Sequence, residues 1–282
     1  MKEFKLNNGV LIPSVGIGTF LLEPNDAYNS VKEALKQGYR LIDTANVYVN
    51  ERAVGRAIKY SNVDRKDIFV STKLWPTEYN NENAIQETLN RLGLDYIDLL
   101  FLHQPAGSWQ KAYKTLEKAY KEGIIKSIGI SNFEGEYIEE LLKDCEITPQ
   151  IIQAECHPSF PQDELRKTTD PKDIRIMAWF PLGGQGQVKQ ILENEVIVEL
   201  AEKYQKSPAQ IVLRWHNEMG FIVIPGSKNA EHIKDNLNIQ DFELTKQDLE
   251  KIATLNTNTR HYHATKELLD NYANWPPKYE TE

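Results

Sequence analysis

The chain has 282 residues, of which 33 are lysine or arginine and 41 are aspartate or glutamate, so its formal net charge is −8. Hydrophobic residues make up 40% and charged residues 26% of the chain, which is typical of a folded globular protein and excludes a disordered or fibrous one. The acidic balance argues against nucleic acid or an anionic membrane as a partner.

Cysteine content and hydropathy exclude further classes. The two cysteines, Cys145 and Cys156, are too few for a disulfide scaffold and do not have a metal-ligand spacing. No apolar run approaches the ~18 residues of a membrane span, and residues 1–8 are charged and polar. We therefore expect a cytoplasmic protein that forms one domain over residues 1–282 and contains no metal site.

The first predicted element is a β-hairpin over residues 4–12. Asn8-Gly9 lies there between two short apolar runs, a dipeptide that strongly favours a two-residue hairpin turn. We expect this hairpin to close the bottom of a barrel built by the elements that follow.

From residue 15 onward, short apolar runs alternate with amphipathic stretches, as in repeated βα units. The predicted strands cover residues 15–18, 40–43, 68–74, 97–103, 125–130, 151–154, 174–179 and 221–224. The predicted helices cover residues 26–37, 51–60, 82–92, 109–122, 136–143 and 195–205. Gly38, Gly93 and Gly123 follow three of these helices, in the position where glycine commonly ends a helix.

Eight strands in this alternation favour a (β/α)8 TIM barrel with the N-terminal hairpin at its bottom. A doubly wound open sheet stays possible, since alternation does not distinguish the two. Against it, the segment Gly16-Ile17-Gly18-Thr19 has no third glycine in register and does not open a helix directly, unlike a dinucleotide-binding fingerprint. Residues 183–187, GGQGQ, predict a mobile loop after the seventh strand.

Ionisable residues lie at the ends of successive predicted strands. Asp43 ends the second, Lys73 nearly ends the third and His103 ends the fourth, while Tyr48 lies in the loop after Asp43. The carboxyl ends of barrel strands all face one rim, where barrel enzymes build their active sites. We therefore expect these four side chains to meet, although each taken alone has an ordinary structural explanation.

Together these four residues suit a site in which Tyr48 donates a proton and the other three support it. The pKa of tyrosine is ~10 in water, and a neighbouring ammonium lowers it. We expect Lys73 to lower the pKa of Tyr48 by ~2 units, or about 2.7 kcal/mol. Asp43 is expected to hold Lys73 in its charged form, and a neutral His103 to orient a substrate carbonyl.

Three segments then make the chain resemble the aldo-keto reductase family over nearly its whole length. They are LIDTANVYVNERAVGRAI at 41–58, FVSTKLW at 69–75 and IDLLFLHQP at 97–105. The resemblance implies a barrel enzyme that transfers a hydride between a nicotinamide cofactor and a carbonyl compound. It assigns the catalytic tetrad to Asp43, Tyr48, Lys73 and His103.

The same resemblance implies a nicotinamide site. GISNF places Ser131 and Asn132, and IIQAECHP places Gln153, where the family binds the carboxamide. MAWFPLGG puts Trp179 where relatives have a stacking tyrosine, and Phe180 where they have a serine. Trp179 retains the ability to stack, but Phe180 has no hydroxyl for the pyrophosphate. Further cofactor contacts are expected from Thr19, Asp43 and Leu182.

At the adenosine end, the resemblance points to FIVIPGSKNAEHIKDN at 221–236. Gly226 and His232 stand where many NADPH-selective relatives have lysine and arginine, and a 2′-phosphate requires cationic or bidentate donors. Ser227 and Lys228 are expected to bind that phosphate, and Asn236 the adenine. NADP(H) is therefore the expected cofactor, with NAD(H) as the alternative.

A small carbonyl or alcohol substrate is expected beside Tyr48 and His103, against an apolar wall of Phe20, Trp75 and Trp109. Tyr272 and Trp275 in the C-terminal tail are expected to cover this wall. We predict reversible reduction of aldehydes and ketones to alcohols, by a monomer or weak homodimer. Two other functions fit parts of the pattern. One is a non-catalytic, nucleotide-sensing barrel of the same superfamily, and the other is an aldolase barrel in which Lys73 forms a Schiff base.

Overall fold

The computed structural model describes residues 2–184 and 186–280, so Met1, Gln185 and the last two residues lie outside the description. The described strands are β1 (Glu3–Lys5), β2 (Leu11–Pro13), β3 (Ile17–Gly18), β4 (Leu41–Asp43), β5 (Phe69–Leu74), β6 (Leu99–Leu102), β7 (Ile128–Ser131), β8 (Ile151–Glu155), β9 (Arg175–Trp179) and β10 (Ile222–Val223). Among the described helices, none combines the length and apolar character that a membrane crossing needs.

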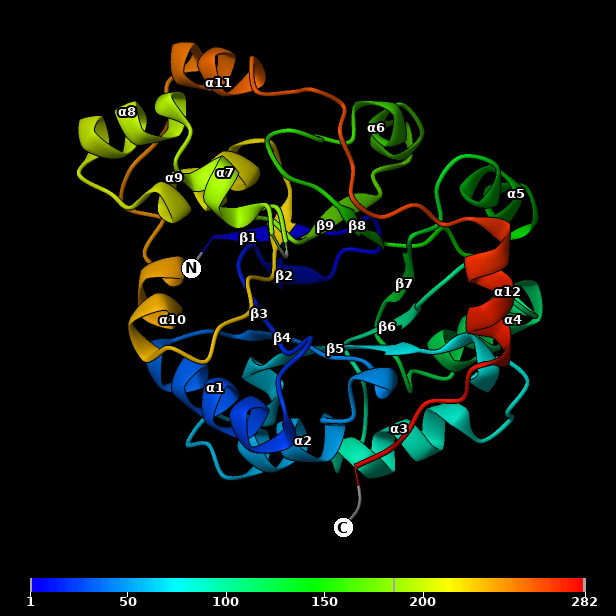
Figure 1. Cartoon of the computed structure of the whole chain (residues 1–282). Coiled ribbons are helices and arrows are strands. Elements are labelled where there is room, and N and C mark those ends of the chain that lie inside the picture. The colour runs from blue at the N-terminus through cyan, green and yellow to red at the C-terminus, as the bar shows by residue number, and fades with distance from the viewer. Residues whose placement is uncertain (1, 185, 281–282) are drawn as a thin grey trace.

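Helices connect the strands and enclose them (Figure 1). The α-helices are α1 (Pro24–Gln37), α2 (Glu51–Lys59), α3 (Ala84–Leu92), α4 (Trp109–Lys121), α5 (Glu136–Asp144), α6 (Asp163–Thr169), α7 (Val188–Leu192), α8 (Glu195–Tyr204), α9 (Pro208–Glu218), α10 (Ala230–Leu237), α11 (Lys246–Ala253) and α12 (Lys266–Asn274). Four 3₁₀ turns are η1 (Asn46–Tyr48), η2 (Arg65–Asp67), η3 (Pro76–Glu78) and η4 (Asp170–Lys172).

The sheet is a closed barrel. Strands β3 to β10 pair in parallel, each with its neighbours in chain order. A parallel bridge between Val15 and Val223 joins the segment before β3 to β10, and the amide of Gly16 donates to the carbonyl of Val223 at 2.8 Å. Closure leaves no open edge, which confirms the (β/α)8 prediction and excludes the doubly wound alternative.

The N-terminal hairpin lies where the sequence predicts it. Strands β1 and β2 pair antiparallel, and Gly9 has a φ of +88°, which glycine adopts without strain. Its buried side chains, Phe4, Leu6 and Ile12, form one cluster with inward-facing residues of the barrel strands. The hairpin therefore closes the amino-terminal end of the barrel, and crosses the centre of the ring of helices in Figure 1.

Helix α1 illustrates how local sequence sets the helix ends. Proline at position 24 starts the helix, where its missing N–H group is not needed. Gly38 ends it in the left-handed conformation, with its N–H bonded to the carbonyls of Ala34 and Leu35. The apolar face that includes Val31 and Leu35 is buried against the barrel, so the periodic spacing of these residues decides the orientation of the helix.

Candidate active site

The four side chains at the predicted strand ends lie together at the carboxyl rim of the barrel. Asp43 ends β4, Lys73 lies in β5, His103 directly follows β6 and Tyr48 ends η1. The ammonium nitrogen of Lys73 is 4.9 Å from the centre of the Tyr48 ring. The ring centres of Tyr48 and His103 are 5.7 Å apart. Residues that are distant in the sequence therefore form one constellation.

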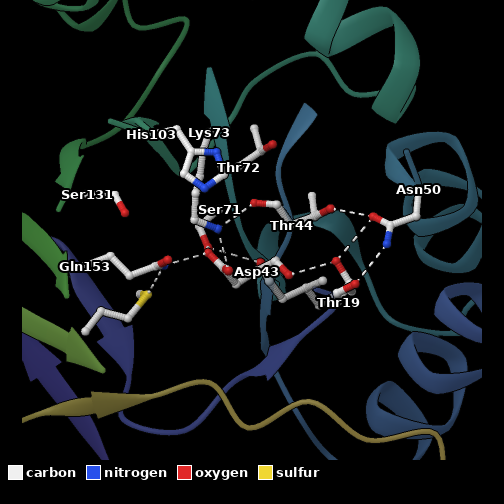
Figure 2. Close-up of polar contacts among 12 residues, drawn as sticks. Thr19, Asp43, Thr44, Asn50, Ser71, Thr72, Lys73, His103, Ser131 and Gln153 are labelled. Atoms are coloured by element: carbon white, nitrogen blue, oxygen red, sulfur yellow. Dashed lines mark hydrogen bonds and ion pairs between the residues drawn. The ribbon is translucent and has the colours of Figure 1, made fainter. Parts of the chain in front are cut away.

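A buried ion pair lies at the centre of this constellation (Figure 2). Lys73 Nζ is 2.6 Å from Asp43 Oδ2, with side chains 0% and 2% exposed, and Nζ also donates to the carbonyl of Thr44 at 2.8 Å. The second carboxylate oxygen of Asp43 accepts hydrogen bonds from the Ser71 hydroxyl at 2.8 Å and the Gln153 amide at 3.0 Å. Both carboxylate oxygens of Asp43 and two of the three N–H donors of Lys73 are therefore engaged, which fixes both side chains.

Burial dominates the acid–base behaviour of Lys73 and Tyr48. It lowers the pKa of Lys73, while the carboxylate of Asp43 opposes this effect. It raises the pKa of Tyr48 well above 10, and the negative charge of Asp43 adds to the rise. The expected lowering of the Tyr48 pKa is therefore wrong in direction, because desolvation penalises the phenolate and the negative charge of Asp43 adds to that effect.

His103 behaves as predicted. Burial, followed by the positive charge of Lys73, lowers its pKa well below 6.5, so the imidazole is neutral near pH 7. Its amide donates to the carbonyl of Leu74 at 3.0 Å, which anchors it to the end of β5. Its buried Nδ1 has no hydrogen-bond partner among the described residues. A neutral imidazole held in this way is able to direct one ring N–H toward a bound ligand.

Two of the three predicted wall residues lie at this site. Phe20, 48% exposed, packs on Tyr48 with ring centres 5.0 Å apart. Trp75 meets His103 edge-on at 5.1 Å. Trp109 is buried and packs instead against Phe133, at 5.3 Å. The structure therefore places Phe20 and Trp75 beside the tetrad, and Trp109 in a core contact.

The C-terminal segment covers Trp75. The indole N–H of Trp75 donates to the carbonyl of Trp275 at 2.8 Å, and the rings of Tyr272 and Trp275 lie 4.8 and 5.7 Å from its ring centre. Tyr262 lies farther back along this segment, and its hydroxyl donates to Gln104 Oε1 at 2.9 Å. One wall of the site is thus built by residues that follow the last barrel strand.

The residues predicted to bind the nicotinamide form one network. The indole N–H of Trp179 donates to Asn132 Oδ1 at 3.0 Å. The amide of Asn132 donates to the carbonyl of His103 at 3.3 Å and to the Ser131 hydroxyl at 3.2 Å. Gln153, which binds Asp43, lies on the neighbouring strand, paired in register with Ser131. These four residues lie together, and much of their hydrogen-bonding capacity is already used.

Thr19, Leu182 and Phe180 occupy the loops around this network. Thr19 is buried and its hydroxyl lies 3.1 Å from the carbonyl of Asp43. Leu182 is half-buried and packs on the core. Phe180 has a φ of +50°, which is strained for a bulky residue. Its ring packs against Trp179 at 4.9 Å and faces Phe20 at 6.3 Å. The aromatic at this position therefore extends the apolar surface of the rim.

The four residues predicted for the adenosine end lie before or within α10. The Ser227 hydroxyl accepts the amide of Asn229 at 3.1 Å. Lys228 is exposed and pairs with Asp26 at 3.4 Å, and an exposed pair of this kind is weak enough to exchange for a phosphate. His232 is exposed and Asn236 is buried. Loop and helix thus present two lysines, Lys228 and Lys234, and several polar groups to solvent, while Asn236 is buried.

Several residues that build the site were not predicted. Asn50 accepts the Thr44 hydroxyl at 2.8 Å and donates to the carbonyls of Thr19 and Leu22, both at 2.9 Å. It thereby ties the loop after β3 to the end of β4, as Figure 2 shows. Ser71 lies two residues before Lys73 and therefore on the same face of β5, a signal that the sequence already contains.

Glu51 supports Lys73 from the outer side of the barrel. It is 2% exposed, and it accepts hydrogen bonds from the Thr72 hydroxyl and from Arg91 Nε, both at 2.6 Å. Burial raises the pKa of Glu51, while the charges of Arg91 and Lys73 oppose the rise. A second carboxylate therefore acts electrostatically on the buried ammonium, next to the one that binds it directly.

Comparison with known proteins identifies the family. A profile described as "Aldo/keto reductase family" matches residues 14–257. The chain belongs to the aldo-keto reductase family. It is 44% identical over 270 residues to a glyoxal reductase of Bacillus subtilis (strain 168), covering 94% of this chain and 96% of that protein. It is 38% identical over 262 residues to a methylglyoxal reductase of Escherichia coli (strain K12), covering 91% and 94%.

A solved structure supports the same assignment. The chain superposes with a TM-score of 0.89 on an aldo-keto reductase from a Medee basin deep-sea metagenome library, at 40% identity, covering 93% of this chain and 97% of that one. The protein is therefore an oxidoreductase that reduces carbonyl compounds to alcohols with a nicotinamide cofactor. Neither the nucleotide sensor nor the Schiff-base aldolase receives support from these relatives.

Proposed function

We propose that this aldo-keto reductase uses NADPH to reduce small aldehydes and ketones, with 1,2-dicarbonyl compounds as its preferred class. The observation that carries the proposal is the buried Asp43–Lys73 pair, 2.6 Å apart, beside Tyr48 and a neutral His103. Two relatives are named for glyoxal and methylglyoxal, which supports the choice of dicarbonyls.

The residues at the rim fit a nicotinamide cofactor. Amide and hydroxyl groups of Ser131, Asn132 and Gln153 are chemically suited to a carboxamide, and Trp179 offers an aromatic face. When bound, the reduced nicotinamide supplies the hydride, which is chemistry that no side chain of the protein provides. Thr19, Asp43 and Leu182 are proposed as further contacts on the same side of the site.

Tyr48 is proposed as the proton donor. Its raised pKa keeps the phenol protonated near pH 7, so the donor form is always present. An alkoxide forming on the substrate is a stronger base than a phenolate, so it takes this proton as negative charge develops. The Lys73 ammonium lies 4.9 Å from the centre of the Tyr48 ring, where its charge faces the resulting phenolate, and Asp43 holds it in place.

His103 and the aromatic residues are proposed to orient the substrate. One ring N–H of His103 donates to the carbonyl oxygen, which fixes the oxygen between His103 and Tyr48. Phe20 and Trp75 form the apolar wall beside it. Trp109, which packs against Phe133, is proposed as the third residue of that wall.

The preference for NADPH is proposed to rest on Ser227 and Lys228, with His232 as a weaker partner for the 2′-phosphate. Asn236 is assigned to the adenine. Because Gly226 and His232 provide no permanent second cation, we expect a modest preference over NADH, of about tenfold, which is about 1.4 kcal/mol. We further propose that residues 1–282 form a single domain, which acts in the cytoplasm as a monomer or weak homodimer.

Steady-state kinetics test this function. We would measure kcat/KM for glyoxal, methylglyoxal, aldoses and simple ketones, with NADPH and with NADH. The proposal expects the highest values for the dicarbonyls with NADPH. A Lys228→Ala variant should reduce the preference for NADPH and leave kcat with NADH unchanged. Absence of turnover with every dicarbonyl would refute the substrate assignment. A clear preference of the wild type for NADH would refute the cofactor assignment.

A further inference from the structure

A second cluster of chemically active side chains lies where β8 meets the C-terminal segment. Glu155 is the last residue of β8, His157 follows it, and His261 lies in the segment after the last barrel strand. Glu155 and His157 are both 0% exposed, whereas His261 is exposed. One ligand atom from each residue lies within 4.8 Å of the others. Two imidazoles and a carboxylate form a common donor set for zinc.

The distances in this cluster are close to those of a coordination sphere. His157 Nε2 is 3.1 Å from Glu155 Oε1, while two ligands of a tetrahedral zinc ion at ~2.0–2.1 Å are about 3.3 Å apart. The His157 and His261 rings are stacked, with centres 5.4 Å apart. A shift of His261 by about 1.5 Å would complete the ligand spacing, and an exposed side chain can make it by rotation.

The charge on Glu155 points to a missing cation. Its oxygens accept the backbone N–H groups of His261 at 2.8 Å and Tyr262 at 2.9 Å, besides the contact with His157. The ion-pair partner that the structure describes for it is the His157 imidazole, at 3.1 Å, which is positively charged only when it is protonated. A fully buried carboxylate is costly when its partner is neutral. A divalent metal ion would supply the positive charge.

We propose that Glu155, His157 and His261 bind one divalent metal ion with zinc-like preferences, and that this ion fastens the C-terminal segment to the barrel rim. On binding, the metal takes the place of the proton between His157 Nε2 and Glu155, and that proton is released to solvent. Water fills the fourth position. The ion holds His261 beside Tyr262, whose hydroxyl binds Gln104 at the edge of the substrate site. This proposal departs from the expectation of no metal site: Glu155 and His157 are distant from His261 along the chain, so no sequence motif links them.

Metal titration tests the proposal directly. Chelator-treated protein would be titrated with Zn²⁺ by calorimetry and with Co²⁺ by visible absorption. We expect one equivalent to bind, with release of a proton and with the absorption of a low-symmetry cobalt site. His261→Ala should weaken binding at least tenfold. His261→Cys should retain it, since a thiolate also binds zinc and adds a sulfur charge-transfer band with cobalt.

His263→Ala is the matched control, because His263 is an exposed histidine of the same segment that lies outside the cluster. It should bind both metals as the wild type does. The proposal is overturned if the wild type binds no equivalent of metal, or if His261→Ala binds as tightly as wild type. Equal losses in the two alanine variants would also overturn it. Since the titration needs neither cofactor nor carbonyl substrate, its result is independent of the proposed reductase activity.

Discussion

The stability effects of replacing Asp43 and Lys73 are predicted to be coupled. The double variant should lose less free energy of unfolding than the sum of the losses in the two single variants. Both side chains are buried and 2.6 Å apart, and removing one member of a buried pair typically costs about 3–5 kcal/mol, since the other charge stays uncompensated. After Asp43→Asn, Lys73 retains the carbonyl of Thr44 as its charge-stabilising contact. After Lys73→Met, Asp43 retains Ser71 and Gln153. We therefore expect about 5 kcal/mol for Asp43→Asn and about 3 kcal/mol for Lys73→Met.

Equilibrium urea denaturation of the wild type, the two single variants and the double variant measures this coupling. The double variant should lose at least about 2 kcal/mol less than the sum of the single losses. The Lys206–Asp241 pair is the matched control: it has the same 2.6 Å separation, but Asp241 is 54% exposed, so its coupling should stay below about 1 kcal/mol. Losses at Asp43 and Lys73 that add to within about 0.5 kcal/mol would refute the reasoning.

Three further predictions concern single positions. Because the pKa of His103 is lowered, its titration should cause no step in kcat between about pH 6 and 8. The free energy of unfolding should fall as the pH drops below about 6.5, because there His103 gains a proton in the unfolded chain but stays neutral in the folded one. A step near pH 6.5 that His103→Gln abolishes would contradict this. Gly55→Ala should destabilise the protein by about 3 kcal/mol, since its Cβ would clash with the backbone carbonyl oxygen of Leu92. An unchanged melting temperature would contradict the packing of α2 on α3. Glu51→Gln should lower the free energy of unfolding by about 3 kcal/mol, since Arg91, whose side chain is only 10% exposed, loses its carboxylate partner. An unchanged free energy of unfolding, measured by urea denaturation, would contradict this prediction.

The barrel and its tetrad could be predicted because both follow from local rules. Alternating strands and helices fix the order of the elements, and the carboxyl ends of parallel strands share a rim. Asp43, Lys73 and His103 therefore had to converge once the barrel closed. The strand boundaries moved by a few residues, since β7 starts at Ile128 rather than at residue 125. Ile125, where that strand was predicted to begin, forms only an isolated bridge with Ile97.

Other features depend on tertiary surroundings that a linear pattern does not contain. The upward direction of the Tyr48 pKa shift follows from burial and from the negative charge of Asp43. Trp109 packs against Phe133 because it starts α4 on the core side of that helix. Helices α9 and α11 were missed even though Ser207 and Thr245 each begin a capping box, a local signal that was available in the sequence.

The sequence analysis expects Tyr272 and Trp275 to cover the substrate wall, and both contact Trp75, but the individual hydrogen bonds of the C-terminal segment were beyond sequence reasoning. The hydrogen bonds of Trp75 to Trp275 and of Glu155 to His261 join residues that are distant along the chain. Neither contact has a periodic or motif signature, because the path of a segment over the surface is set by packing. This segment forms one wall of the substrate site, so the physiological substrate depends on the part of the chain that is hardest to predict.

Proton donation by Tyr48 is the central claim, and a Tyr48→Phe variant tests it most directly. Its single-turnover rate with methylglyoxal and saturating NADPH would be measured alongside the NADPH dissociation constant, obtained from protein fluorescence. We predict a loss of about 10²–10⁴-fold in rate, with the dissociation constant within about twofold of wild type. A rate equal to that of the wild type, with cofactor binding intact, would contradict the account.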